Sequence, residues 1–189
     1  TGLGFHAYNV LKRPGRLSWH NLFYGAPVGA PVALLLAGRL GRTGEKVRDG
    51  QRRYFGVQVD RLLGLVSAIG LAGTVGEAGL MHFRGAFQNP AMVLPVSAPP
   101  VAAALLGHAM ADPDANTGRL ARAWLRLTAA LGFIGVGFHA FGVARSMGGW
   151  RNWRQNVLNG PPLPAPPSFT GLAIAGLAAL ELLGERRDD

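Results

Sequence analysis

The stretch NLFYGAPVGAP, residues 21–31, decides the fold because its pattern recurs twice further along the chain. In this pattern Asn is followed by five residues, then Pro, two residues, Ala and Pro. NPAMVLPVSAP at residues 89–99 and NVLNGPPLPAP at residues 156–166 follow it too, and successive copies begin about 67 residues apart. Three regularly spaced copies in 189 residues indicate internal duplication of a larger structural unit.

The composition indicates that this unit is built from membrane helices. Hydrophobic residues make up 49% of the chain and charged residues only 15%, against about 25% charged in soluble domains. Uncharged runs of about 18 residues or more predict transmembrane helices. The opening TGLGFHAY reads as the last turns of a helix, so we expect the first span to be truncated in this chain. The expected spans cover residues 1–10, 22–40, 62–82, 91–111, 120–143 and 167–184.

Each copy of the pattern precedes an even-numbered span, and each odd-numbered span ends near a histidine: His6, His82 or His139. A unit of two spans returns to its starting side, so three such units share one orientation and are related by an axis along the membrane normal. We therefore predict an all-α integral membrane protein of about six helices, built from three helix-hairpin repeats with pseudo-threefold symmetry. It forms a single transmembrane domain, with repeats at about 1–50, 51–115 and 116–189.

The repeated prolines have a structural and a functional interpretation. Proline fits the first turn of a helix, where its missing N–H costs nothing, and an Asn side chain can bond the backbone just before that turn. The pattern is then helix-start chemistry. The alternative is that the three loops form a shared rim for a ligand or a partner. The sequence leaves both interpretations open.

The distribution of basic residues predicts the orientation. The repeat-loop side carries seven and no acid: Lys12, Arg13, Arg16, Arg84, Arg145, Arg151 and Arg154. The other side carries twelve: Arg39, Arg42, Lys46, Arg48, Arg52, Arg53, Arg61, Arg119, Arg122, Arg126, Arg186 and Arg187. The positive-inside rule therefore predicts that the repeat loops lie outside and the C-terminus in the cytoplasm. We expect a cell membrane of the bacterial inner-membrane type.

The repeat-loop side is basic, aromatic and rich in Asn, which suits a protein partner, and Arg and Trp are enriched at interface hot spots. Anchoring to lipid headgroups is the alternative for the same aromatic residues. The net charge of +9 lies mostly beside the spans, so we expect membrane lipids as partners and no nucleic acid. The candidate partner-binding residues are Trp19, His20, Asn21, Asn89, Trp150, Arg151, Trp153, Arg154 and Asn156.

The three helix-end histidines are the candidate cofactor ligands. Neutral imidazole binds haem iron or Zn²⁺, so His6, His82 and His139 could converge on a metal, or two of them could hold a haem b from facing helices. Two other interpretations stay open: the histidines bond loop carbonyls, or they handle protons. His108 lies near the opposite membrane surface and cannot join this group, and a second cofactor at that end stays open.

Glu77 is the one carboxylate well inside an expected span. Such a group costs a few kcal/mol to insert, so it marks a functional site by default. Its glycine neighbours offer the alternative that water or a nearby backbone group satisfies it. The glycines of GLAGTVGEAG, which includes Glu77, and of LGFIGVGFHAFG predict close contacts between helices.

Three functions follow from these features. The first is an anchor or scaffold subunit of a larger membrane complex, which docks an extracytoplasmic redox partner and could bind haem b or a metal through the helix-end histidines. The second is a small transporter or channel that uses Glu77. The third is a scaffold without a cofactor. We favour the anchor class, because no constellation of residues in the sequence can run a reaction unaided, and we expect at most a non-catalytic subunit of an oxidoreductase.

Overall fold

The computed structural model describes residues 2–24, 29–54 and 56–188. The chain is 81% helical, and four helical segments are long and apolar enough to cross a membrane: Val59–Arg84, Pro90–Ala111, Ala115–Arg145 and Ala165–Arg187. These findings are consistent with an all-α membrane protein. The elements are α1 (Gly2–Leu11), α2 (Trp19–Tyr24), α3 (Gly29–Arg48), β1 (Arg53–Tyr54), β2 (Val57–Gln58), α4 (Val59–Arg84), η1 (Pro90–Val93), α5 (Leu94–Ala111), α6 (Ala115–Arg145), η2 (Gly149–Asn152), α7 (Trp153–Asn159) and α8 (Ala165–Asp188).

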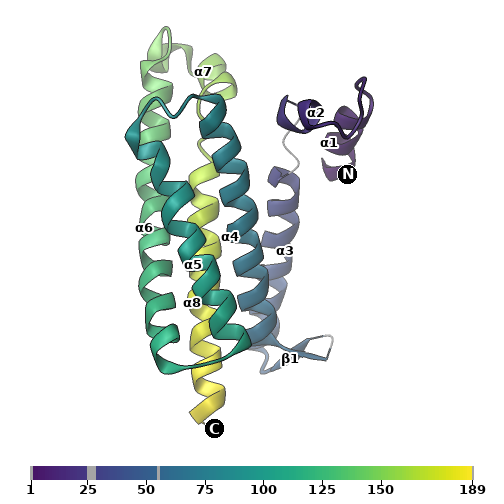
Figure 1. Ribbon diagram of the computed structural model, residues 1–189, viewed down its shortest axis with the longest axis vertical. Coiled ribbons are helices and arrows are strands. Elements are labelled where there is room, and N and C mark those ends of the chain that lie inside the picture. The colour runs from purple at the N-terminus through teal and green to yellow at the C-terminus, as the bar shows by residue number, and fades with distance from the viewer. Residues whose placement is uncertain (1, 25–28, 55, 189) are drawn as a thin grey trace.

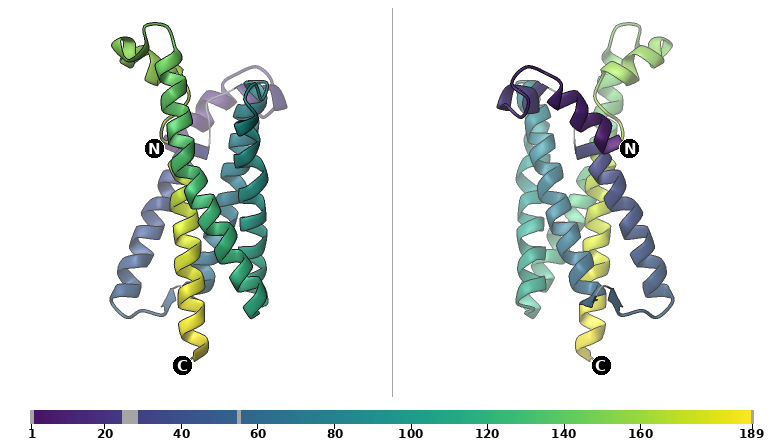
Figure 2. Two further views of the ribbon diagram at one scale, coloured as in Figure 1. Left: turned by 90° about the vertical axis from the view of Figure 1, so that its left-hand side faces the viewer. Right: turned by 90° about the vertical axis from the view of Figure 1, so that its right-hand side faces the viewer.

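The four long helices α4, α5, α6 and α8 run alternately up and down and form a ring (Figure 1). Along the ring α4 packs on α5, α5 on α6, α6 on α8 and α8 on α4, while α3 packs on the outside of α4. Figure 2 shows α7 and the α4–α5 loop at one end, and the β-hairpin and the C-terminus at the other. A four-membered ring does not by itself show threefold symmetry, so the symmetry and the six spans stay predictions.

The first third of the chain differs most from expectation. With 10 residues, α1 is too short to cross a bilayer alone. The expected span 22–40 includes residues 25–28, which lie outside the described residues. Helix α3 continues to Arg48, eight residues beyond the expected end, because Lys, Arg and Glu are good helix formers that sequence reasoning had assigned to a loop. The remaining polar segment is not purely irregular, since β1 and β2 pair as a short antiparallel hairpin.

The prolines of the repeated pattern occur where helices begin. Pro95 lies in the first turn of α5, and Pro166 lies in the first turn of α8, which begins at Ala165. These positions confirm helix-start chemistry for both copies. Pro99 and Pro100 lie deeper, inside α5, so the end of the second copy is part of the helix proper. Helix α8 has 24 residues, longer than the expected span 167–184, because it begins two residues earlier and continues through the charged segment after residue 184.

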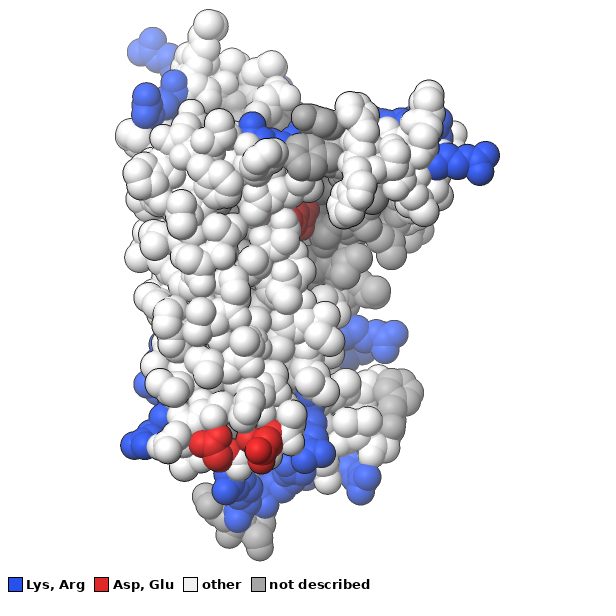
Figure 3. Space-filling view, in the orientation of Figure 1, with Lys and Arg blue, Asp and Glu red and all other residues white. Residues whose placement is uncertain are grey.

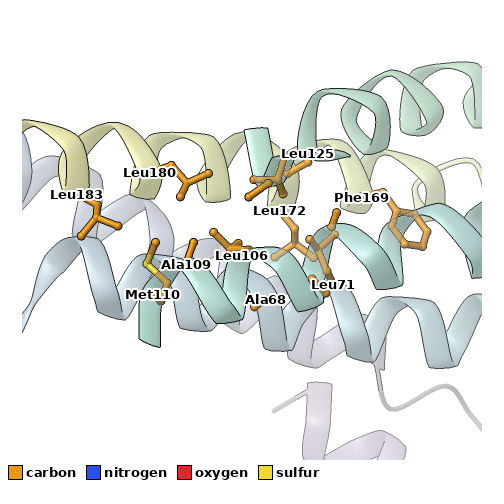
Figure 4. Close-up of a cluster of buried hydrophobic side chains, with 14 residues drawn as sticks. Ala68, Leu71, Leu106, Ala109, Met110, Leu125, Phe169, Leu172, Leu180 and Leu183 are labelled. Atoms are coloured by element: carbon orange, nitrogen blue, oxygen red, sulfur yellow. The ribbon is translucent and has the colours of Figure 1, made fainter. Parts of the chain in front are cut away.

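The core of the bundle is a cluster of small and branched apolar side chains from all four helices. Leu71 of α4, Leu106 of α5, Leu125 of α6 and Ala173 of α8 are fully buried there (Figure 4). The outside is also apolar: in α6 only 17% of the most apolar 18-residue window is buried, and Phe133 and Phe141 are exposed. An apolar surface of this extent is what a lipid-facing helix presents.

Glycines bring α6 and α8 into close contact. A Cβ atom at Gly132 would meet the Thr170 side chain and lie 2.8 Å from the Pro166 carbonyl oxygen, and one at Gly135 would lie 2.8 Å from Pro166 Cβ. The Thr170 hydroxyl donates a hydrogen bond of 2.9 Å to the Ala129 carbonyl. The expected small-residue contact between the two helices is therefore confirmed at Gly132 and Gly135, whereas an added Cβ at Gly137 would meet no described atom within 4 Å.

The expectation holds for only part of the glycine-rich stretch of α4. A Cβ atom at Gly70 would lie 2.7 Å from Leu172 of α8. Gly73 and Gly76 differ, because added Cβ atoms there would meet no described atom within 4 Å. The close contact of α4 at Gly70 thus lies about two turns before Glu77, not beside it.

Candidate functional site

The candidate site lies at the end of the bundle that carries residues 12–24, 85–93 and 146–164, which we call the loop end. In each of the three segments, two consecutive residues have positive φ: Gly15 and Arg16, Ala86 and Phe87, Gly148 and Gly149. Left-handed backbone of this kind reverses the chain tightly and is uncommon for residues other than glycine. The three loops therefore leave their helices through similar turns, which is local support for the repeat.

His82 closes the loop between α4 and α5. Its Nδ1 lies 2.8 Å from the Met92 carbonyl oxygen, and its ring meets the ring of Phe87 edge to face. A carbonyl oxygen can only accept a hydrogen bond, so Nδ1 carries the proton. The interpretation that this histidine bonds a loop carbonyl is thereby confirmed.

His139 makes the same kind of bond in the loop between α6 and α8. Its Nδ1 lies 2.7 Å from the Pro162 carbonyl oxygen, just before α8 begins. In a neutral imidazole that donates through Nδ1, the Nε2 atom is left as an acceptor or a ligand, the tautomer common among metal-bound histidines. His82 and His139 also lie within electrostatic range of each other.

His6 is in a different position from the other two histidines. It lies on α1, half-buried, within electrostatic range of Glu77 on α4. Among the described residues, which include all three histidines, no group of three or more His, Cys, Asp or Glu side chains could hold a metal ion. The structure thus brings His6 within electrostatic range of Glu77 and His82 within electrostatic range of His139, and does not assemble the three-histidine centre.

Two asparagines of the repeated pattern hold their own loops in shape. The Asn21 amide donates to the carbonyls of Pro14 at 2.8 Å and Arg16 at 3.0 Å. The Asn156 amide likewise donates to two carbonyls two residues apart, those of Met147 at 3.2 Å and Gly149 at 2.8 Å. We call these two arrangements the Asn clamps.

The Asn clamps change the expected partner surface. Asn21 is 3% exposed and Asn156 is 5% exposed, so neither side chain has surface to offer a partner. Asn89 differs from both: it is exposed, and its Oδ1 accepts the Ala91 N–H at 2.9 Å, which starts η1. The role of the buried asparagines is to position the residues around them.

The exposed residues around the clamps are aromatic and basic. Trp19 is 85% exposed, and Trp150 and Trp153 are each about half exposed. The Arg154 guanidinium lies 5.7 Å from the centre of the Trp153 ring, a cation–π distance. His20 and Arg151 are exposed too. The loop end therefore presents tryptophan and positive charge from two segments far apart in the sequence.

Sequence reasoning missed the opposite end, which carries residues 47–61, 109–122 and 180–187 and which we call the arginine end. From the sequence, the arginines of this end indicate only the orientation in the membrane, whereas in the structure they make specific contacts. Arg186 Nη2 lies 2.9 Å from Oδ2 of the buried Asp60, an ion-pair distance without hydrogen-bond alignment, and Arg52 lies 3.2 Å from Glu185. Charged side chains gather toward both ends on the face shown in Figure 3.

No known protein family, no curated protein and no solved structure matches the chain. The function therefore has to be argued from the geometry of the two ends.

Proposed function

We propose that the protein is an integral membrane scaffold of three helix-hairpin units and six spans that docks a partner protein at its loop end. One observation carries this proposal: exposed tryptophans and arginines lie on the short helices α2, η2 and α7, and buried Asn clamps fix the turns that precede these helices. A fixed loop loses little conformational entropy when it binds, so its exposed anchors favour tight docking. Trp and Arg are the side chains most enriched among such anchors.

Site-specific photo-crosslinking in native membranes tests the docking. A photoreactive residue at Trp150 should give one discrete cross-linked product, and Arg151→Ala together with Arg154→Ala should abolish it. The same residue at Val57, which is comparably exposed on the hairpin of the opposite end, is the matched control. Equal products from both positions, or no product at position 150, would contradict the proposal.

The orientation in the membrane can be measured because the chain contains no cysteine. We propose that the loop end lies outside the cell membrane and that the C-terminus is cytoplasmic, on the basis of twelve basic residues against seven. A membrane-impermeant maleimide should then label Met147→Cys in intact cells and Asp112→Cys only after permeabilisation. Both positions are exposed, so the reverse order would overturn the orientation.

A redox version of the scaffold is favoured by one observation, the shared tautomer of His82 and His139. In this version the two Nε2 atoms bind haem b or a metal, and the docked partner is an electron carrier. The absorbance spectrum of the purified protein decides it. We expect a Soret band that disappears in His82→Ala and in His139→Ala. Absence of both a Soret band and stoichiometric metal would remove the cofactor and leave the scaffold.

The transporter alternative is favoured by the proximity of His6 and Glu77. A carboxylate within a span and a nearby imidazole can exchange protons during transport. Glu77→Gln should then abolish substrate or proton flux in proteoliposomes, whereas Glu181→Gln, an exposed carboxylate near the other end, should not. Flux that is indifferent to Glu77→Gln would remove this alternative.

A further inference from the structure

A groove at the arginine end is a second candidate site, separate from the loop end. It has a volume of about 650 Å³ and lies between the end of α5, the first turns of α6 and the last turns of α8. Arg119, Arg122 and Arg187 line it, together with the apolar side chains of Leu180 and Leu183. This volume falls in the range of ligand sites in proteins.

Each of the three arginines is held by a neutral acceptor. Arg119 donates to Asn116 Oδ1 at 2.6 Å, Arg122 to the Leu180 carbonyl at 3.0 Å and Arg187 to the Pro113 carbonyl at 3.3 Å. A guanidinium group has five N–H donors, so these bonds leave most of its donors and all of its charge for a ligand. The bonds fix the positions of the groups without neutralising them.

A smaller cavity of about 200 Å³ at the same end shows the contrast. Arg52 and Arg186 line that cavity, and they are paired with Glu185 and Asp60 respectively. Among the side chains that the structure describes, none of the three groove arginines has such an ion pair. The positive charge of these three arginines is therefore not cancelled by direct ion pairs.

The groove does contain one carboxylate, that of Asp114. Its Oδ1 accepts the N–H groups of Asn116 and Thr117, both at 2.9 Å, so it is committed to the start of α6. Three guanidinium groups face this one carboxylate, and the groove keeps a net positive charge. An anion with oxygen acceptors, such as a phosphate group, fits this donor set.

The position of the groove distinguishes between sources of phosphate. One membrane-crossing segment ends at Ala111, the next begins at Ala115 and a third ends at Arg187, all beside the groove. Its depth is therefore that of the lipid headgroups, and its apolar floor continues into the core of the bundle. Basic pockets between helices at the cytoplasmic surface suit anionic headgroups.

We propose that this groove binds the headgroup of one anionic phospholipid. Arg119 and Arg187 hold the phosphate from opposite walls. Arg122 lies on the floor between Gly118 and Gly184, where an added Cβ would come within 3.6 Å and 3.9 Å of its guanidinium nitrogens. The bond from Arg122 to Leu180 also ties α6 to α8, so the lipid bridges two helices that are already linked at its base. The site is independent of the docking proposed for the loop end.

Native mass spectrometry of the whole protein, mixed with phosphatidylglycerol or with phosphatidylcholine, tests the site. We expect one retained phosphatidylglycerol and no retained phosphatidylcholine. Arg119→Gln combined with Arg187→Gln should weaken retention about 30-fold, from the loss of two basic contacts at the membrane surface. The control is Arg48→Gln with Arg61→Gln, which removes the same charge from exposed positions outside the groove at the same end.

Each possible outcome bears on the proposal. Retention of the lipid by the control pair supports the groove, whereas equal loss in both pairs means general surface attraction and overturns it. Inorganic phosphate at millimolar concentration should not displace the lipid; displacement would mean a soluble anion as the ligand and would also overturn the proposal. Circular dichroism and gel filtration establish that the variants fold, and Arg119→Lys with Arg187→Lys, which preserves the charge, should restore part of the retention.

Discussion

At the loop end, neutral side chains tie successive helices together, whereas at the arginine end guanidinium groups do so. His82 and His139 bond the carbonyls that precede α5 and α8, and the Asn clamps hold the outer loops. At the arginine end, Arg122 and Arg187 bond carbonyls on neighbouring segments. Both ends therefore use a side chain to satisfy a backbone carbonyl where the chain turns.

The difference lies in what each end leaves for another molecule. The Asn clamps carry no charge, so the charge described at the loop end comes from exposed side chains around them, such as that of Arg154. A guanidinium group stays charged after it has donated a hydrogen bond, so Arg119, Arg122 and Arg187 keep their positive charge inside the groove. The first arrangement suits a broad protein surface, and the second suits a small anion.

The largest loss of stability is expected from a change in the contact between α6 and α8, because both helices reach the loop end and the arginine end. Gly132→Leu would place a side chain against Thr170 and the Pro166 carbonyl. Overpacking of this kind should cost about 3 kcal/mol or more and weaken both ends together. Unfolding in detergent, followed by circular dichroism, measures the loss. The control is Gly137→Leu on the same helix, where no described atom lies within 4 Å and little change is expected. Leucine has a better helix propensity than glycine, so equal loss in both variants would show that added bulk anywhere on α6, and not the contact with α8, is responsible.

A smaller effect, confined to one end, is expected from Asn156→Ala. The substitution removes two hydrogen bonds and leaves the Met147 and Gly149 carbonyls unsatisfied, which should cost about 2 kcal/mol. Hydrogen exchange should accelerate in residues 146–160 and stay unchanged at the arginine end. Asn159→Ala serves as the control, because Asn159 is exposed and makes a single bond to Gln155. Acceleration that spreads to α8 would contradict a local clamp.

His82→Ala should have a smaller effect again. It removes one hydrogen bond, between Nδ1 and the Met92 carbonyl, worth about 1 kcal/mol. Exchange should accelerate in residues 85–93, with no change in residues 146–160. His108→Ala, which alters an exposed histidine in the last turn of α5, is the matched change at the arginine end. If both variants leave exchange at the loop end unchanged, the bond from His82 does not hold the loop.

The four long helices were predictable because hydropathy decides them. The expected spans 62–82, 91–111, 120–143 and 167–184 all lie within the observed candidate spans. The end of α3 was not predictable from the sequence, because Arg42, Lys46 and Arg48 are as compatible with a helix as with a loop. The hairpin at residues 53–58 was missed too, since two residues in each strand give no readable alternation.

At the sites, the sequence predicted residues better than it predicted their roles. It singled out Asn21 and Asn156 through the repeated pattern but could not indicate that both are buried. It left the histidine bonds to loop carbonyls open, and the structure shows two of them. The arginine groove could not be predicted, because Arg119 and Arg187 come together only when α6 and α8 pack.

The smallest effect is expected from the one carboxylate of the groove. Hydrogen bonds from the Thr117 hydroxyl, and from the backbone N–H groups of Thr117 and Asn116, lower the pKa of Asp114 below its ordinary value. A lowered pKa in the folded state means that ionised Asp114 stabilises the protein above about pH 4 and that this contribution is lost as the pH falls further. Asp114→Asn keeps the cap on α6, because Asn also caps helices well, but it removes the titration. Thermal unfolding of the two proteins between pH 3 and pH 6 measures this: the variant should lose less stability on acidification.

Because the Asp114→Asn substitution also removes the negative charge from the groove, phosphatidylglycerol retention should rise slightly. Unchanged retention would mean that this carboxylate is too far from the phosphate to oppose it.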